Sequence, residues 1–293
     1  MSIGAELQLG RVEAVRLVRN PALWVAIAVT GWWTWATAAD SVSENTYFML
    51  LGYSLIVPGF VIVIHTVLAV LRSRMSRTEE LLGVVPVGAD RRTLGHGVAT
   101  LAGGAIGLVV IAAIYVALRP ASIIGPGGNS IPDTIDLPRP NLAQLLQGPF
   151  AVVAVTAFAV ALVRWIPTWV VLAPLLFLTA FQALMFGLWL GVPSGNGTWW
   201  FPLGTGVVNG EWIGCGEFDA LCDLPVSGFD RVTPWWHLAY LVAIAVMFVV
   251  VAVLRHRRDR STWTMFAASL TLVVALAVVQ AVVSEKYVPA FAS

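Results

Sequence analysis

Residues 236–254 read WHLAYLVAIAVMFVVVAVL, and every side chain from Leu241 to Val253 is apolar. A helix of this length reaches across about 30 Å of hydrocarbon, whereas a helix on the surface of a soluble protein keeps a polar face. The stretch is too long for a strand, and it lacks the alternating polarity of a membrane barrel. It therefore predicts a helix inside a bilayer.

Similar stretches recur along the chain of 293 residues, of which 58% are hydrophobic and only 11% are charged. Soluble domains carry about a quarter charged residues, so this composition does not suit a water-facing surface. Because a helix satisfies its own backbone hydrogen bonds in lipid, we expect an all-α polytopic membrane protein. The seven expected spans are residues 22–39, 47–71, 97–118, 149–163, 167–190, 236–254 and 264–283.

The distribution of cations indicates the orientation, because Lys and Arg near span ends stay on the cytoplasmic side. With the N-terminus inside, 13 of the 17 cations are cytoplasmic: Arg11, Arg16, Arg19, Arg72, Arg74, Arg77, Arg91, Arg92, Arg164, Arg255, Arg257, Arg258 and Arg260. The outer side keeps Arg119, Arg139, Arg231 and Lys286. Omitting one span would move an arginine group outside. Seven spans with a cytoplasmic N-terminus and an outer C-terminus are therefore the consistent count.

Residues 1–21 combine an apolar helical face with a polar one. The apolar residues are Ile3, Leu7, Ala14 and Val18, and the polar ones are Glu6, Glu13, Arg16 and Arg19. We expect an amphipathic helix along the inner membrane surface, or a short cytosolic helix without lipid contact. The region lacks a signal-peptide cleavage pattern, so we expect the first span to anchor the mature protein.

Both cysteines of the chain, Cys215 and Cys222, fall in the expected outer loop at residues 191–235. Six intervening residues let the chain turn back and bring the two sulfur atoms together, and the outer compartment permits oxidation. We expect a disulfide between them. The alternative is a pair of free thiols.

The motifs of catalysis and metal binding are missing. A nucleotide-binding loop of the form G-x-x-x-x-G-K-[ST] needs a lysine, and the sole lysine, Lys286, follows the last span. The four histidines lack the spacing that places two ligands on one helical face; they are His65, His96, His237 and His256. We expect no catalysis, no metal, no cofactor bound by this chain and no nucleic-acid partner.

His65 is the one histidine well inside an expected span. It fits either a hydrogen bond to a neighbouring helix or a role toward substrate or protons. Ion-coupled transporters usually hold acids or several histidines within their spans, and these spans hold almost none. Energy for transport should therefore come from another polypeptide.

The segment between the second and third spans, residues 72–96, carries signals for a short helix. Ser76 or Thr78 can cap it, Glu79 and Glu80 suit its positive N-terminal end, and Pro86 with Gly88 ends it. Between these signals lie Leu81 and Leu82. An exposed leucine pair flanked by charges fits a docking site for a cytosolic partner, although an ordinary connector would also satisfy the pattern.

Residues 77–82, RTEELL, followed by Pro86-Val87 and by RRTLGH at 91–96, resemble the loop after the second span in permease subunits of ABC-2 type exporters from actinobacteria. Residues 234–241, PWWHLAYL, are similar to the start of their sixth span, and Arg19-Asn20-Pro21 fits the entry to their first. These short motifs follow the family's order of elements across residues 1–260.

The resemblance implies a six-helix permease core of the ABC-2, type V-like, fold, with an elbow helix at residues 1–21. The span at 264–283 is additional to that core. It also implies an exporter subunit in the bacterial plasma membrane, paired with a second copy or a related permease. Separate ATP-binding subunits would hold ATP and Mg and drive transport.

The same resemblance assigns residue roles. Coupling to the ATP-binding subunit would use Thr78, Glu79, Glu80, Leu81, Leu82 and Pro86, and the translocation path would include Tyr53, His65, Thr179, Phe181 and Gln182. Two alternatives stay open. One is a non-transporting accessory or immunity protein that uses the same docking surface. The other is a membrane enzyme acting on lipid-linked substrates, against which the near absence of buried acids speaks.

Overall fold

A computed structural model describes residues 4–38, 42–43, 54–75, 89–118, 123–124, 142–166, 170 and 233–285. Helices make up almost all of this part of the chain: α1 (Gly4–Val18), α2 (Pro21–Ala38), α4 (Ile56–Met75), α6 (Ala89–Leu118), α7 (Leu142–Trp165), α9 (Thr233–Leu254) and α10 (Arg260–Glu285). The exception is a short parallel pair formed by β1 (Val42–Ser43) and β2 (Ile123–Ile124). The expected all-helical class is confirmed.

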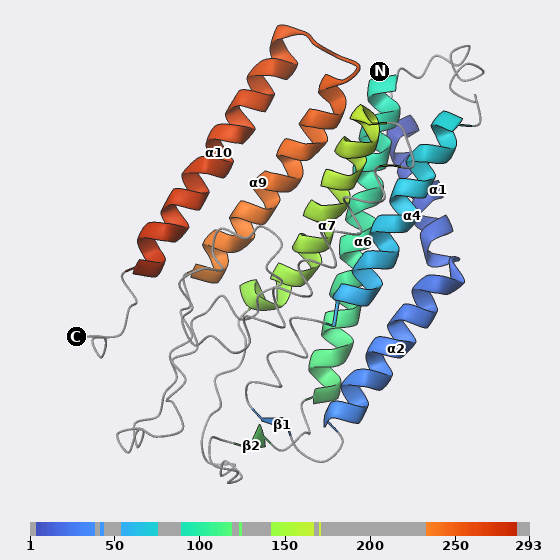
Figure 1. The fold of residues 1–293 in the computed structure, drawn as a ribbon, viewed down its shortest axis with the longest axis vertical. Coiled ribbons are helices and arrows are strands. Elements are labelled where there is room, and N and C mark those ends of the chain that lie inside the picture. The colour runs from blue at the N-terminus through green and yellow to red at the C-terminus, as the bar shows by residue number, and fades with distance from the viewer. Residues whose placement is uncertain are drawn as a thin grey trace.

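Four of the described helices are long and apolar enough to cross a membrane: Arg92–Leu118, Leu145–Trp165, Trp235–Leu254 and Arg260–Gln280. A shorter apolar helix, Ile56–Arg72, lies within α4. Figure 1 shows these helices side by side along a common direction. The chain is therefore a membrane protein, as its composition predicts.

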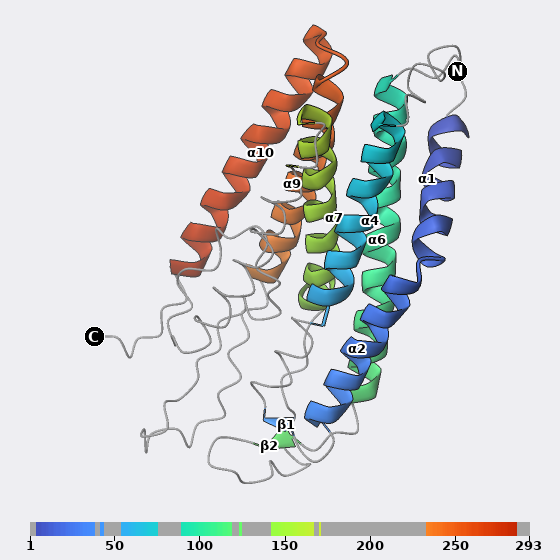
Figure 2. The same cartoon turned by 45° about the vertical axis from the view of Figure 1, so that its right-hand side comes forward.

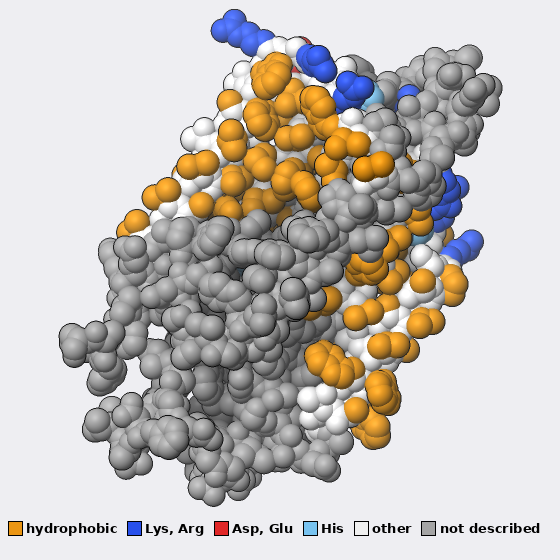
Figure 3. Space-filling view, in the orientation of Figure 1, with side chains coloured by type: hydrophobic (Ala, Val, Ile, Leu, Met, Phe, Trp, Pro, Cys, Tyr) orange, Lys and Arg blue, Asp and Glu red, His pale blue; other side chains and the backbone are white. Residues whose placement is uncertain are grey.

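The outer surface of α10 is suited to hydrocarbon. Only 17% of its most apolar window is buried, and Leu272, Val274 and Val278 are each more than half exposed. In Figure 3 apolar side chains cover the visible faces of α9 and α10, while the visible Lys and Arg side chains gather at the top and along the upper right edge. Lipid can solvate such a surface, whereas exposing it to water would cost free energy.

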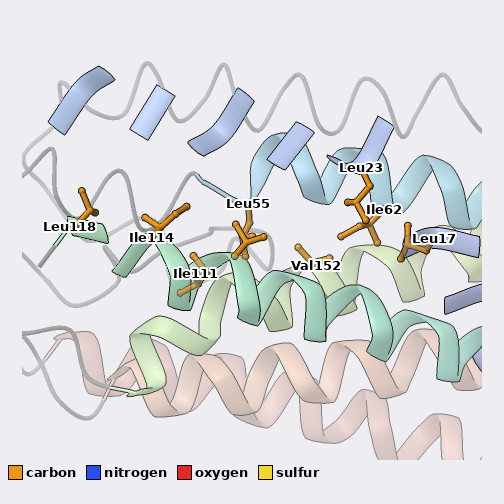
Figure 4. Close-up of a cluster of buried hydrophobic side chains, with 9 residues drawn as sticks. Leu17, Leu23, Leu55, Ile62, Ile111, Ile114, Leu118 and Val152 are labelled. Atoms are coloured by element: carbon orange, nitrogen blue, oxygen red, sulfur yellow. The ribbon is translucent and has the colours of Figure 1, made fainter. Parts of the chain in front are cut away.

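The most buried helix is α7, in which 72% of the apolar window is shielded. It contributes residues to all three clusters of the apolar core. The first, drawn in Figure 4, joins α1, α2, α4 and α6 to Val152 of α7. The second joins α4, α7 and α9, and the third joins α7, α9 and α10. The bundle is therefore built around α7.

The two neighbours α7 and α9 run in the same direction. Phe158 packs on Phe248, with ring centroids 4.9 Å apart, and further along both helices the Trp165 indole donates to the Val251 carbonyl at 3.0 Å. By contrast, α6 runs antiparallel to α7, and α10 runs antiparallel to α9 (Figure 1). Residues 167–232 thus connect opposite ends of the bundle. The expected span at 167–190 lies within this connection, outside the described residues apart from residue 170.

Three glycines on α6 permit close helix packing. A Cβ at Gly103 would lie 2.7 Å from Ile62 Cγ2 of α4, and one at Gly104 would collide with Val153 of α7. At Gly107 it would lie 3.4 Å from Pro149 Cα. Gly103 and Gly107 are four residues apart, the spacing at which small residues let membrane helices approach.

This close packing bears on α7, which begins at Leu142 and not at residue 149 as expected. Pro149 lies inside the helix, where it removes one backbone hydrogen bond and usually ends or kinks the helix. Here Gly104 and Gly107 leave room for the backbone around Pro149. Contacts between helices therefore outweigh the local helix-breaking signal.

The remaining helices differ less from expectation. α2, α9 and α10 closely match residues 22–39, 236–254 and 264–283. α6 begins at Ala89, earlier than residue 97, and its 30 residues extend about 45 Å, longer than the hydrocarbon core. α4 starts at Ile56, whereas residues 47–53 of the expected second span lie outside the described part.

The expected N-terminal helix is present as α1, but it runs alongside the first half of α6 (Figure 2). Leu9 packs against Gly95, and a Cβ at Gly10 would lie 2.6 Å from Val98 Cγ1. The apolar face expected to meet lipid stays open, since Leu7 and Val18 are about half exposed. α1 thus packs lengthwise on α6, because small residues on both helices allow a close approach.

Candidate functional site

At one end of the bundle, several helices begin or end close to an arginine. These are Arg72 near the end of α4, Arg92 near the start of α6, Arg164 near the end of α7 and Arg255 after α9. We call this the arginine-rich end; it is at the top in Figure 1. It corresponds to the side that the cation distribution predicts to be cytoplasmic.

The turn between α9 and α10 lies at this end. The Arg255 guanidinium lies over the Trp165 ring, 5.8 Å from its centroid. Arg257 donates to Asp259 at 2.8 Å, and Asp259 accepts the backbone N–H of Thr262 at 2.9 Å and its hydroxyl at 2.5 Å. These hydrogen bonds from Thr262 and Arg257 lower the pKa of Asp259 to about 2. Asp259 is therefore an ionised N-cap for α10.

A polar group joins the turn after α1 to the middle of α4. Asn20 Oδ1 accepts the Ala22 backbone N–H at 3.1 Å, so its Nδ2 amide is the donor toward His65 Nδ1, 3.3 Å away. This fixes the His65 proton on Nε2, which is buried without a hydrogen-bond partner. The arrangement provides the interhelical hydrogen bond that was one of the two interpretations of His65.

Beside this pair lies a buried carboxylate. Glu13 on α1 is 7% exposed, and one of its oxygen atoms accepts from Arg16 at 2.7 Å. The charges of Glu13, Arg16 and Arg72 all act on the His65 ring. The group thus links α1, α2 and α4 through polar contacts. Because the sequence pattern places Glu13 on the polar face of a surface helix, its burial was not anticipated.

A second group lies between α6 and α7. Arg164 is 1% exposed and His96 is 4% exposed. The charges of Arg164 and Arg92 both act on His96. Two arginines are therefore close enough to one buried imidazole for their charges to act on it. In the sequence Arg92 and Arg164 served only to indicate topology, and their approach depends on the antiparallel pairing of α6 with α7.

At the opposite end, a hydrogen bond links α9 to α10. His237 Nδ1 donates to Gln280 Oε1 at 2.8 Å, and the Gln280 amide donates to the Leu276 carbonyl at 3.3 Å. Both side chains are fully buried. Such a contact suits helix association in lipid. Among the described helices, α10 packs mainly on α9. The His237–Gln280 hydrogen bond holds these two helices in register.

Most of the residues that the sequence assigned to a site lie outside the described part of the chain. This holds for the coupling residues Thr78, Glu79, Glu80, Leu81, Leu82 and Pro86, for the path residues Tyr53, Thr179, Phe181 and Gln182, and for the predicted disulfide Cys215–Cys222. Of the path residues only His65 is described. Within the described residues, no three His, Cys, Asp or Glu side chains come close enough to hold a metal ion.

No protein-family model, curated protein or solved structure matches this chain.

Proposed function

We propose that the chain is the permease subunit of an exporter, forming the translocation path and driven by a separate ATP-binding subunit. The proposal rests on the sequence resemblance in residues 77–96 and on the positions of α4 and α6, the described helices on either side of residues 76–88. α4 ends and α6 begins at the arginine-rich end, so residues 76–88 connect two helices there (Figure 1). A partner on the cytoplasmic side could dock on this connection.

The packing around this connection supports a mechanical role. α6 is held to α1 through Gly95 and Gly10, and to α4 and α7 through Gly103 and Gly104. Close-packed helices move as units, since their cores resist gradual deformation. A displacement applied at residues 76–88 would therefore move α6 together with α1 and parts of α4 and α7. This is the behaviour required of a coupling segment.

The translocation path is a further part of the proposal. Tyr53, His65, Thr179, Phe181 and Gln182 would face the cargo, which the resemblance does not identify. The Asn20 contact leaves His65 Nε2 as the nitrogen that a cargo group could meet. If replacing Tyr53, His65 and Gln182 together leaves export unchanged, these residues do not belong to the path.

The deciding experiment is affinity purification of the tagged chain from its native membrane in a mild detergent. The test variant combines Glu79→Arg, Leu81→Asp and Leu82→Asp, which reverses one charge and removes the leucine pair. The control is Arg258→Ala, an exposed change in the α9–α10 turn at the same end of the bundle. Proteins that co-purify are identified by mass spectrometry.

We expect an ATP-binding protein to co-purify with the wild type and the control, and to be lost from the triple variant. If no ATP-binding protein is recovered with any of them, the exporter proposal fails. Turnover of a lipid-linked substrate by the purified single chain would then support a membrane enzyme. Recovery of the ATPase together with unchanged cargo flux when the path is blocked would support a non-transporting accessory protein.

A further inference from the structure

The outer face of α10 carries a cation at the edge of an apolar surface. Arg260 is the first residue of the helix and lies at the arginine-rich end. Trp263, Thr264 and Ala267 follow at the spacing that places side chains on one helical face, and all are exposed. The opposite face, which includes Gln280, is buried against α9. We call the exposed side the Arg260 face.

The turn before this face has an excess of positive charge. Residues 255–260 read RHRRDR, so four arginines accompany one acid. That acid, Asp259, accepts from Arg257 at 2.8 Å and from the Thr262 backbone N–H at 2.9 Å. Because Asp259 is used in this way, the exposed guanidinium of Arg260 has no counter-charge within the described turn. An anionic ligand would supply one.

The hydroxyl groups on the Arg260 face are satisfied within α10. The Thr264 hydroxyl donates to the Arg260 carbonyl at 2.8 Å, and the Thr271 hydroxyl donates to the Ala267 carbonyl at 2.9 Å. Both threonines are exposed, and each turns its polar group toward its own helix. In hydrocarbon a hydroxyl has no other partner, so this pattern favours acyl chains over a polar protein surface.

A ligand on this face must combine negative charge with hydrocarbon. Trp263 is only about 4.5 Å along the helix axis from Arg260, and it is 53% exposed, while Met265 is 56% exposed. The Trp263 ring packs edge-on against Phe266, with centroids 5.9 Å apart. Tryptophans of membrane proteins concentrate at the level of the lipid headgroups. A phospholipid has its phosphate directly beside its acyl chains and therefore fits this boundary.

We propose that the Arg260 face binds anionic phospholipids in preference to zwitterionic ones, in the leaflet at the arginine-rich end. Arg260 donates hydrogen bonds to the lipid phosphate, whose geometry a guanidinium matches. Trp263 lies beside the glycerol region, and the acyl chains cover Ala267 and Thr271. The preference for net negative charge comes from the arginines of the turn. This lipid surface depends neither on a cargo nor on the proposed exporter function.

Fluorescence quenching on the full-length chain in phosphatidylcholine vesicles tests the proposal at the face itself. A dansyl group is attached to Ala267→Cys, in a chain that also carries Cys215→Ser and Cys222→Ser. Ala267 lies about 10 Å along the helix axis from Arg260. Spin-labelled phosphatidylglycerol or phosphatidylcholine, each with the nitroxide near the top of an acyl chain, is added at the same mole fraction. The ratio of the two quenching constants measures the lipid preference of the face.

The labelled chain is compared with three variants in about 0.15 M salt. Arg260→Gln removes the charge, and Arg260→Lys keeps it. The control, Arg11→Gln, removes an exposed charge from α1, which lies on the other side of the bundle from α10 (Figure 2). We expect Arg260→Gln to lower the preference for phosphatidylglycerol about fivefold, which corresponds to the ~1 kcal/mol that one arginine contributes near an anionic membrane surface.

Arg260→Lys and Arg11→Gln should stay within about twofold of the labelled parent. In about 1 M salt the preference of the parent should fall, because the Debye length shortens to about 3 Å. Equal quenching by the two lipids in the parent would overturn the proposal, and an unchanged preference in Arg260→Gln would refute the role of Arg260. Weak quenching by both lipids would mean that protein, such as a second copy of the chain, covers this face.

Discussion

Replacement of Gly104 by alanine tests whether the glycines of α6 determine how closely the helices of the bundle pack. The new Cβ would overlap Val153 Cγ2 and lie 3.4 Å from the carbonyl oxygen of Pro149. The Pro149 contact has an ordinary van der Waals length, but Val153 is β-branched and strongly prefers one χ1 rotamer in a helix, so its methyl group cannot rotate away without cost. Overpacking of this kind costs about 1–3 kcal/mol, and the gain in helix propensity from glycine to alanine offsets about 1 kcal/mol.

The control is Gly31→Ala on α2. A Cβ at Gly31 would meet no atom within 4 Å, so only the gain in helix propensity remains. We therefore expect Gly104→Ala to lower the free energy of unfolding by up to about 2 kcal/mol, and Gly31→Ala to leave it unchanged or raise it by up to about 1 kcal/mol. SDS titration of the protein in dodecylmaltoside, followed by circular dichroism, measures the difference.

A second substitution makes the argument specific to the contact with α7. Val153→Ala removes the methyl group that the new Cβ would strike, so the double variant should be more stable than the sum of the two single changes indicates, by about 1 kcal/mol. Equal stability of Gly104→Ala and Gly31→Ala would refute the reasoning. Simple additivity in the double variant would also refute it.

Three further predictions concern the α9–α10 pair. His237→Leu should cost roughly 1–2 kcal/mol by leaving the Gln280 carbonyl oxygen buried without its donor, and adding Gln280→Leu should recover part of that loss in the same SDS titration. Because the pKa of Asp259 is lowered to about 2, its ionised cap stabilises the wild type above about pH 4 and is lost as pH falls toward 2; thermal unfolding of Asp259→Asn should lack this dependence. A cysteine introduced at Arg258 in an otherwise cysteine-free variant should react with an impermeant maleimide only after the cells are opened, and labelling of intact cells would reverse the expected orientation.

The sequence predicted helices best where every face is apolar. Residues 236–254 and 264–283 are predominantly hydrophobic and contain no charged residue, and α9 and α10 form there because lipid and neighbouring helices favour the same side chains. The start of α7 was predicted seven residues too late, at 149, because Pro149 is a strong local signal against helix continuation. Glycines of α6, which lie more than 40 residues earlier in the chain, leave room for the backbone around Pro149, so the helix continues through it.

The polar groups of the bundle could be predicted only in part. His65 was recognised as a residue that needs a partner, but Asn20 lies 45 positions away, so their contact follows from the way the helices pack. His237 and Gln280 are separated by 43 positions and pose the same difficulty. Gly103 and Gly107 do carry a readable signal, because a four-residue spacing of small residues in an apolar stretch is typical of a helix interface.

The parallel direction of α7 and α9 sets an order for assembly of the protein. α6 and α7 are antiparallel and close in sequence, so they can pair soon after both have been synthesised. α9 cannot join α7 until residues 167–232 have brought the chain back to the opposite end, and domains form in the order of their synthesis. Until then the face of α7 that α9 will cover, including Ala157 and Phe158, stays open to lipid or to an insertion factor. The most buried helix of the bundle is thus completed in two stages, and the second depends on the longest connection between its described helices.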